Sequence, residues 1–251
     1  MMIDLEMIGE GATAKIYRDE NIAIKLYKNS VITIIEEEAR LQTYAMEAGL
    51  PVPAVHRVKK IDDTQIAFEM EYVDGKPLLH EKMDREERLE KIRSLVELQC
   101  EVHSKSANEF PKQRERLTWK IKQNKYIDEK VKDQLLRTLE ELDTDTSQLC
   151  HGDFHPLNIL FDGKKYWVID WVDATGGNPL ADACRTYIIF QQFISRMATT
   201  YLRYFCEIAK VSSEEVLAWL PIIIAARLSE NMDDKARKML MDLLQDVMKE
   251  N

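Results

Sequence analysis

The sequence is short of cysteine, of long apolar runs and of positive charge, and each shortage argues against a class of protein. Its four cysteines (Cys100, Cys150, Cys184 and Cys206) are widely separated and include no CxxC pair, so neither a zinc knuckle nor a small disulfide framework is indicated. The longest apolar run, residues 216–226, is interrupted by proline and is too short to span a bilayer. The N-terminus is acidic rather than basic. We therefore expect a cytoplasmic protein without a membrane anchor.

The formal net charge is −9, from 35 lysines and arginines against 44 aspartates and glutamates. This balance argues against nucleic acid as the main partner. It is compatible with cationic small substrates, and a solvated acidic surface explains it equally well. With 251 residues, of which 45% are hydrophobic and 31% charged, the chain has the composition of an ordinary soluble globular protein with one large core or two modest lobes.

The first third of the chain has the pattern of a small antiparallel sheet with one helix. Two or three short strands are predicted between residues 3 and 27, and two more over 55–60 and 65–72. Apolar residues on one stripe predict a helix over 32–48, which Gly49 and the following LPVP segment end.

Two features of this part are candidates for chemistry. Gly9 and Gly11 form a GxG in the first turn, where backbone amides can approach phosphates, although a plain hairpin turn uses glycine too. No GK[ST] ending follows, so this is not a Walker A loop. Glu36 to Glu38 are predicted to lie in the first turn of the helix and to complement its dipole, unless one of them turns inward to meet Lys25.

The segment Asp-Gly-Lys-Pro at 74–77 marks the clearest change of pattern, from mainly strand to mainly helix. We place an N-terminal lobe at 1–73, a linker at 74–77 and a helical C-terminal lobe at 78–251. The predicted fold class is therefore α+β.

Capping patterns predict where helices of the second lobe begin. The patterns are Asp84 with Glu87, Asn178 with Pro179, and Ser212 with Glu215, and a further amphipathic helix is predicted over 128–142. Pro221 should break or kink the helix that begins after Ser212. We expect His103 to be a dipole-favouring residue at a helix end rather than a ligand, and the basic segment 111–125 to be a solvated helix face rather than an anion site.

Residues 150–171, CHGDFHPLNILFDGKKYWVIDW, place Asp153, Asn158 and Asp170 among apolar residues typical of buried strands. Burying such groups is costly unless a cation or a substrate compensates them. Their oxygens are the ligands that Mg²⁺ prefers. An alternative takes His151, Asp153 and His155 as a transition-metal site of a hydrolase.

HGDFHPLN followed by VIDW resembles the aminoglycoside phosphotransferase and choline kinase family, a branch of the protein-kinase-like fold. Kinase catalytic loops run H-x-D-x-x-x-x-N and are followed by a strand that ends in a metal-binding aspartate. The GxG hairpin, the AIK motif, the acidic helix, the LPVP turn, the EMEYVDG hinge and the NPLAD helix all occur in family order. The resemblance implies a two-lobe fold and a small-molecule kinase that transfers the γ-phosphate of ATP or GTP to a hydroxyl.

For the HGDFHPLN and VIDW motifs and the helix that follows them, the resemblance implies a role for each matched residue. Asp153 would be the catalytic base, and Asn158 and Asp170 would hold Mg²⁺. His151 would brace the catalytic loop, and Asp182 would brace it from the following helix.

The resemblance also implies a nucleotide site in the first lobe. Its residues would be Gly9, Gly11, Lys25, Glu38, Met70, Glu71 and Val73. Lys25 would bind the phosphates, oriented by an ion pair with Glu38, for which Glu37 is the alternative. The hinge would offer the Glu71 carbonyl and the Val73 amide to the base, and backbone contacts of this kind do not select ATP over GTP.

The acceptor is the least defined partner. Only eleven residues separate Asp170 from Asp182, which leaves no room for a long activation segment, so a protein substrate is disfavoured. An aminoglycoside, an amino alcohol or a sugar is expected. Asp173, Glu230 and Asp233 could anchor a cationic acceptor or be exposed acids at helix ends. A third interpretation is a nucleotide-binding pseudokinase that acts as an interaction module; the presence of every expected catalytic residue disfavours it.

Overall fold

The computed structural model describes residues 5–11, 13–80, 82–143 and 146–250. The chain folds into two compact units, one made of Met1–His80 with Pro156–Val172 and the other of Glu81–His155 with Asp173–Asn251. The first unit thus includes a segment that a single cut at 74–77 assigns to the helical lobe. The lobe boundary at 74–77 stays a prediction.

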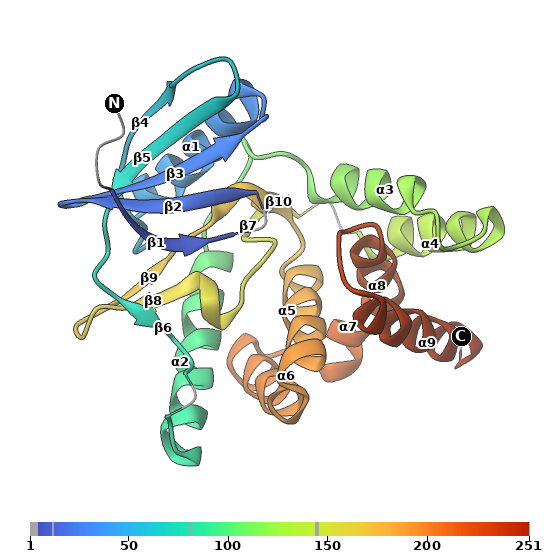
Figure 1. Ribbon diagram of the computed structural model, residues 1–251. Coiled ribbons are helices and arrows are strands. Elements are labelled where there is room, and N and C mark those ends of the chain that lie inside the picture. The colour runs from blue at the N-terminus through green and yellow to red at the C-terminus, as the bar shows by residue number, and fades with distance from the viewer. Residues whose placement is uncertain (1–4, 12, 81, 144–145, 251) are drawn as a thin grey trace. The chain divides into compact units, whose positions relative to one another are not determined.

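The first unit is built on a five-stranded antiparallel sheet and one helix (Figure 1). Its elements in this part are β1 (Glu6–Glu10), β2 (Ala14–Asp19), β3 (Ile22–Lys28), α1 (Ile32–Glu47), β4 (Val55–Lys60) and β5 (Gln65–Glu71). The strand order is β1-β2-β3-β5-β4. The small antiparallel sheet with one helix that the sequence predicts is therefore confirmed.

Helix α1 lies against this sheet because its apolar stripe meets the inward side chains of β3 and β5. Ile35 and Ala39 of α1 join Tyr27 of β3 and Phe68 and Met70 of β5 in one buried cluster. Burial of large apolar side chains of this kind contributes about 1.5–3 kcal/mol each to folding. The cluster fixes the helix on the two strands that carry the lysine and the hinge residues.

The prediction that Glu36 to Glu38 occupy the first helical turn is wrong. The helix begins at Ile32 and has no acidic residue in its first turn. Glu38 follows Ile35 by three residues and so faces the same side of the helix. The helix therefore places this one glutamate in the interior, at 1% exposure.

The second part of the first unit is a small three-stranded sheet. Its elements are β6 (Lys76–Pro77), the 3₁₀ helix η1 (Pro156–Asn158), β8 (Ile159–Phe161) and β9 (Tyr166–Val168), in the order β6-β8-β9. The β8–β9 hairpin turns at Asp162, whose carboxylate accepts hydrogen bonds from the amides of Lys164 and Lys165 and from the Trp167 indole. The Val168 amide donates to the carbonyl of Pro51 at 2.8 Å, which ties β9 to the LPVP segment.

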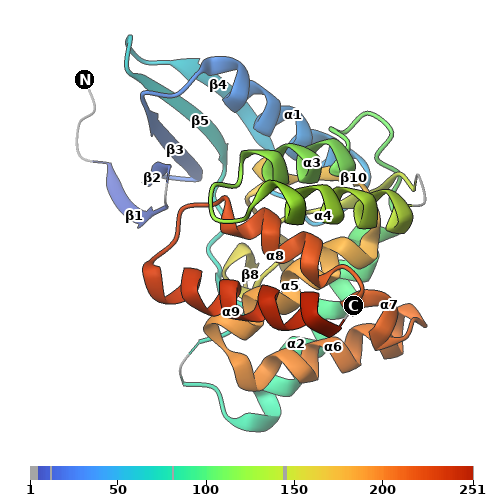
Figure 2. The same ribbon diagram turned by 90° about the vertical axis from the view of Figure 1, so that its right-hand side faces the viewer.

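The second unit is mainly helical (Figure 2). Its helices are α2 (Arg85–His103), α3 (Gln113–Gln123), α4 (Glu129–Leu142), α5 (Pro179–Phe193), α6 (Ser195–Ala209), α7 (Ser213–Leu217), α8 (Leu220–Leu228) and α9 (Asp234–Glu250), and its two-stranded sheet pairs β7 (Gln148–Cys150) with β10 (Thr175–Gly177). The chain passes from the first unit back to the second within the 3₁₀ helix η2 (Trp171–Asp173).

The capping predictions for these helices are confirmed. Asp84, Asn178 and Ser212 each accept a hydrogen bond from a first-turn amide, and Ser212 forms a complete capping box. Pro221 lies in the first turn of α8, after α7 has ended, so it breaks the helix rather than kinking it. Helix α6 was not predicted. None of the helices in the described ranges is both long and apolar enough to cross a membrane.

Candidate active site

In the first unit, Lys25 joins strand β3 to two carboxylates. Its Nζ donates to Glu38 Oε1 at 2.6 Å and to Asp170 Oδ1 at 3.0 Å. The Tyr27 hydroxyl donates to the other oxygen of Glu38 at 2.6 Å. Glu37 instead pairs with Arg40 on the exposed side of α1. The structure thus brings Lys25 together with Glu38 and not with the alternative Glu37.

The charge of Lys25 is held firmly. Burial alone would lower the pKa of Lys25, but the carboxylates of Asp170 and Glu38 outweigh it and raise the pKa above the ordinary value for lysine. Burial is also the main reason that the pKa of Tyr27 is raised. Lys25 is therefore a permanent cation with Tyr27 neutral beside it, a suitable group for binding phosphate.

The β8–β9 hairpin places Asn158 and Asp170 close together in the chain fold. Asn158 directly precedes β8, and Asp170 follows β9 by one residue, at the same end of the antiparallel pair. The Ile169 amide donates to the Asn158 carbonyl at 3.0 Å, which joins the two flanks. Asp170 has a φ of 68°, a left-handed backbone that costs a residue with a Cβ about 1–2 kcal/mol. Strained positions of this kind cluster at functional sites.

The donor set at this hairpin end fits Mg²⁺. Asn158 and Asp170 offer an amide and a carboxylate oxygen, which are hard ligands. The Asp170 side chain is 40% exposed, so its carboxylate can be reached from solvent although it also accepts from Lys25. These two residues could hold a Mg²⁺ ion that keeps part of its water shell.

The remaining first-unit residues lie on the predicted elements. Met70 is buried in the cluster between β5 and α1, and the Gln42 amide approaches its sulfur at 3.5 Å. The Glu71 amide donates to Ala54, and the Val73 carbonyl accepts from Gly75. Contact of the Glu71 carbonyl and the Val73 amide with a nucleotide base stays a prediction.

Gly11 lies in the β1–β2 turn, as predicted, but Gly9 lies within β1 and pairs with Ile16 of β2, so its predicted place in the turn is wrong. A Cβ added at Gly9 would lie 3.6 Å from Ile16, and one added at Gly11 would lie 3.6 Å from the carbonyl of Ala14. Both are ordinary contact distances, so packing within the chain does not require glycine at either position. Close approach of a phosphate would explain both glycines, and that explanation stays a prediction.

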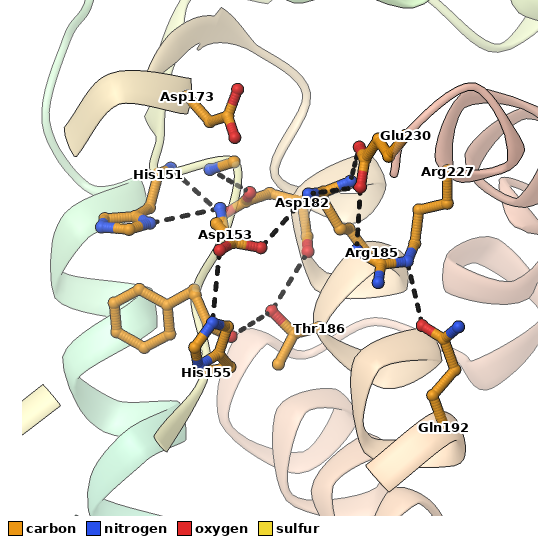
Figure 3. A network of polar contacts seen from close by, with 12 residues as sticks. His151, Asp153, His155, Asp173, Asp182, Arg185, Thr186, Gln192, Arg227 and Glu230 are labelled. Carbon is orange, nitrogen blue, oxygen red and sulfur yellow. Dashed lines mark hydrogen bonds and ion pairs between the residues drawn. The ribbon is translucent and has the colours of Figure 1, made fainter. Parts of the chain in front are cut away.

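In the second unit, the HGD loop is held by one buried carboxylate, that of Asp182 on α5 (Figure 3). Its Oδ1 accepts from the Gly152 amide at 2.8 Å, and its Oδ2 accepts from the His151 amide at 3.3 Å. The His151 Nδ1 in turn accepts from the amide of Asp153 at 3.2 Å. Asp182 and His151 thus fix the backbone that carries Asp153.

Gly152 is required by this geometry. Its φ is +82°, and an added Cβ would clash with the backbone carbonyl of Asp173. Only glycine adopts such a backbone without cost and leaves the space that the approach needs.

His103 has a role beyond the one predicted. Its Nε2 lies 2.9 Å from Asp182 Oδ2, and its side chain is buried. His103 does lie in the last turn of α2, as predicted, and the unpredicted part of its role is the buried contact with Asp182. Burial would raise the pKa of Asp182, but the hydrogen bond and charge of His103 lower it overall.

Helix α5 carries two further residues that the sequence analysis missed. Thr186 lies one turn after Asp182, and its hydroxyl donates to the Phe154 carbonyl at 2.9 Å. The Arg185 Nη2 contacts Asp153 Oδ1 at 3.2 Å. Arg185 and Thr186 follow Asp182 by three and four residues, and residues at this spacing face the same side of a helix. This spacing could have identified both residues as neighbours of the loop that Asp182 holds.

Asp153 is 28% exposed and lies between two cationic or polar groups (Figure 3). His155 Nε2 is 3.2 Å from Asp153 Oδ2, and Arg185 contacts the other oxygen. Burial alone would raise the pKa of Asp153, but the His155 hydrogen bond and the Arg185 charge hold it well below its usual range. The carboxylate is therefore ionised at neutral pH.

The acids considered as anchors for a cationic acceptor are already engaged. Glu230 accepts from Lys120 at 2.7 Å and from Arg185 at 2.7 Å. Asp173 lies 3.2 Å from Arg116 Nη2. Asp233 caps α9, where it accepts from the Ala236 amide. The prediction that Glu230 is an exposed acid at a helix end is wrong, because three cations surround it. The same pairs show that part of the basic segment 111–125 faces acids of its own unit rather than solvent.

The hydrolase alternative finds little support in this geometry. His151 uses Nδ1 to accept from the chain, and its ring packs edge-on against Phe154 at 5.5 Å. Among the residues that the structure describes, the cluster with metal-ligand proximity is His103, Cys150 and Asp182 instead. In that cluster Asp182 is the carboxylate that receives the loop amides, which accounts for its burial without a metal.

A sequence profile of the phosphotransferase enzyme family matches residues 11–220. The chain belongs to this family. It is therefore a phosphotransferase, as the motif resemblance implied. Among curated proteins, no sequence matches the chain significantly.

Solved structures share the fold. The chain superposes on aminoglycoside phosphotransferase APH(4)-Ia with a TM-score of 0.71 at 17% identity, over 98% of this chain and 93% of the other. It superposes on the aminoglycoside-3′-phosphotransferase of type VIII with a TM-score of 0.66 at 20% identity, over 89% and 93%. A GDP and kanamycin complex of APH(2″)-IIIa gives 0.66 at 16%, over 100% and 95%. This likeness confirms the predicted protein-kinase-like α+β fold.

Proposed function

We propose that this phosphotransferase transfers the γ-phosphate of ATP or GTP to a hydroxyl of a small molecule in the cytoplasm. The observation that carries the proposal is Lys25, which contacts both Glu38 on α1 and Asp170 after β9. A lysine held by a helix carboxylate next to a candidate metal ligand is the arrangement that kinases use at nucleotide phosphates. The solved structures of this fold include complexes with AMP-PNP, ADP and GDP.

In this proposal the first unit binds the nucleotide. Lys25 would donate to the phosphate oxygens, and Glu38 would keep its ammonium group in position. Asn158 and Asp170 would hold Mg²⁺, which when bound neutralises charge on the phosphates. The Glu71 carbonyl and the Val73 amide would meet the base edge, and Gly9 of β1 with Gly11 of the following turn would cover the phosphates.

In the second unit Asp153 would accept the hydrogen bond of the acceptor hydroxyl and take up its proton. Phosphoryl transfer proceeds through a loose transition state, so the attacking oxygen needs orientation more than early deprotonation. The low pKa of Asp153 is compatible with this role because an ionised carboxylate is always ready to accept the hydrogen bond. His151 and Asp182 would act indirectly by fixing the loop.

Candidate acceptors are aminoglycosides, amino alcohols and sugars, and a protein substrate is disfavoured. The competing proposal is a pseudokinase that binds the nucleotide without transferring phosphate. The complete set Lys25, Asp153, Asn158 and Asp170 favours the enzyme.

The test is transfer of labelled γ-phosphate from ATP and GTP to a panel of aminoglycosides, choline, ethanolamine, homoserine and sugars. Asp153→Asn should lower turnover about 10²–10⁴-fold while nucleotide binding is retained. Asp63→Asn is the matched control, because Asp63 is fully exposed on the first unit. Unchanged transfer by Asp153→Asn would refute the assigned base. Tight binding of Mg²⁺ and nucleotide with no transfer to any acceptor would favour the pseudokinase.

A further inference from the structure

A cluster of cationic side chains surrounds the carboxylates beside Asp153 in the second unit (Figure 3). The cations are Arg116 and Lys120 of α3, Arg185 of α5 and Arg227 of α8, and the carboxylates are Asp153, Asp173 and Glu230. Four cations therefore pair with three carboxylates, and a fourth carboxylate at the cavity, that of Asp182, is engaged by His103 and the loop amides. Arg116, Lys120 and Arg185 line a small cavity that also touches Gly152 and Asp173. This cavity adjoins the loop that presents Asp153.

Glu230 is shared too widely to balance its partners. Lys120 Nζ and Arg185 Nη1 both lie 2.7 Å from its Oε1, and Arg227 Nη1 lies 3.3 Å from its Oε2. The three cations draw the pKa of Glu230 down to about 2 against the effect of burial. One carboxylate thus serves three positive groups, of which Arg185 and Arg227 have side chains only 11% exposed.

The carboxylates of Glu230, Asp153 and Asp173 raise the pKa of Arg185 against the effect of burial, but two observations indicate that the arginines of this cluster have room for a further anionic partner. Burial and the nearby charge of Arg185 lower the pKa of Arg227. The Nε of Arg185 is buried and has no hydrogen-bond partner among the described residues. Buried guanidinium groups are normally fully paired, because an unpaired donor away from water costs about 1–3 kcal/mol. An additional anion at this place would relieve both conditions.

A polycationic acceptor would meet the wrong charge here. The two carboxylates that line the cavity are both engaged, Asp173 by Arg116 and Asp182 by His103 and the loop amides. Binding an ammonium group would require breaking one of these pairs or placing it against arginine, and like charges at such distances cost several kcal/mol. An aminoglycoside-type acceptor therefore does not fit the charges beside Asp153.

We propose that the acceptor hydroxyl belongs to a molecule that also carries an oxyanion, a carboxylate or a phosphate, and that Lys120, Arg185 and Arg116 bind this group. The inference rests on the proposed kinase function and, within it, favours an anionic acceptor over the aminoglycosides and amino alcohols among the candidates above. In the reaction, the acceptor oxygen forms the new bond to the γ-phosphorus, the bond to the β-bridging oxygen breaks, and the hydroxyl proton passes to Asp153. The oxyanion takes no part in these steps and orients the acceptor.

The test uses two acceptor series, each with an anionic, a neutral and a cationic member on a related carbon skeleton. Glycerate, methyl glycerate and 3-amino-1,2-propanediol test a carboxylate, and glucose 6-phosphate, glucose and glucosamine test a phosphate. Transfer from ATP is measured for the whole protein with each compound. The anionic member of at least one series should have a kcat/KM about tenfold or more above its neutral partner, since charge-assisted hydrogen bonds are about twice as strong as neutral ones.

Variants on α3 separate a binding role from a structural one. Lys120→Gln should raise the KM for the anionic acceptor about tenfold and change the KM for the neutral partner and for ATP much less. Lys122→Gln makes the same change of charge at an exposed position of the same helix and should leave all three values unchanged. A purely structural Lys120 would move the stability and not the charge selectivity.

Direct binding covers acceptors that are not turned over. With AMP-PNP and Mg²⁺ present, the NMR signals of glycerate or glucose 6-phosphate should broaden when the wild-type protein is added. They should broaden less when the Lys120→Gln variant is added. Three results would overturn the proposal of an anionic acceptor. They are a higher kcat/KM for the cationic members or for kanamycin, equal effects of Lys120→Gln and Lys122→Gln, and no binding of either anion. Transfer to a cationic acceptor would leave the kinase proposal intact, whereas loss of nucleotide binding itself would refute the kinase proposal.

Discussion

Replacing Asp182 by alanine should damage the second unit more than any other single truncation near the loop. The carboxylate accepts from the amides of Gly152 and His151 and lies 2.9 Å from His103 Nε2. All of these groups are buried or partly buried. Alanine would leave two backbone donors and one histidine nitrogen without their partner, and it would also remove the longer hydrogen bond that Gln99 Nε2 donates at 3.4 Å.

The magnitude follows from those orphaned groups. A buried donor that loses its acceptor costs about 1–3 kcal/mol. In Asp182→Ala two backbone amides lose their acceptor, and water that enters the space offsets part of the cost. The free energy of unfolding should therefore fall by about 3–5 kcal/mol. Asparagine keeps one oxygen for the Gly152 amide and can donate to His103 after a tautomer change, so Asp182→Asn should cost only about 1–2 kcal/mol.

Urea unfolding followed by circular dichroism measures both variants. With a slope of about 1–3 kcal/mol per molar urea, Asp182→Ala should move the midpoint by more than about 1 M and Asp182→Asn by much less. Equal stability of the alanine and asparagine variants would contradict the account of Asp182 as an acceptor of loop amides. It would indicate that the loop is held by packing alone.

The pH dependence gives a second readout. The pKa of Asp182 is lowered in the folded protein below the ordinary value for aspartate, chiefly by His103 acting against burial, so the unfolded chain binds its proton first as pH falls. The carboxylate therefore contributes its stability above about pH 4 and loses it as pH falls through the folded pKa. The difference in unfolding free energy between the wild type and Asp182→Asn should shrink as pH falls below about 4. An unchanged difference down to about pH 3 would contradict this linkage.

Two further substitutions have matched controls within the chain. Gly152→Ala should lower the free energy of unfolding by about 2–4 kcal/mol, because the added Cβ clashes with the backbone of Asp173. Gly163 also has a positive φ, of +93°, but open space around it, so Gly163→Ala should cost only about 1–2 kcal/mol. Thermal unfolding measures both variants, and equal losses would argue against the clash. Glu38→Gln should weaken nucleotide binding about 10–100-fold because Lys25 loses its buried partner, whereas Glu37→Gln on the exposed face of α1 should not weaken it. Calorimetric titration with AMP-PNP measures the affinity of each variant. Equal affinities of the two variants would refute the orienting role of Glu38.

The fold was predictable where local patterns agree with tertiary packing. The alternating strands, the stripe of α1 and the capping residues at Asp84, Asn178 and Ser212 all specify their elements within the chain itself. Helix α6 was missed because it lacks a side-chain cap at its start. The start of α1 at Ile32 was predicted, but the acidic cluster was assigned to the first turn although it begins four residues later, in the second turn.

The site was predictable in its spacing and unpredictable in its charge balance. Lys25 and Asp153 lie in motifs whose residue types and separations are specific. The engagement of Glu230 by Arg185 and Lys120 joins three segments that are far apart in sequence, so no local pattern shows it. Burial of His103 against Asp182 is of the same kind, since the two are 79 residues apart.

The discontinuity of the first unit has a consequence for the order of folding. Lys25 and Asp170 are 145 residues apart, and β6 pairs with β8 from the later segment. At a synthesis rate of roughly 5–20 residues per second, residues 81–172 take about 5–18 s to be made, and only then is the segment that completes the first unit available. In that interval the nascent first unit exposes the edge of β6 and a Lys25–Glu38 couple that still lacks Asp170. Chaperone binding to ribosome-bound chains should therefore be strongest for chains that end before residue 172.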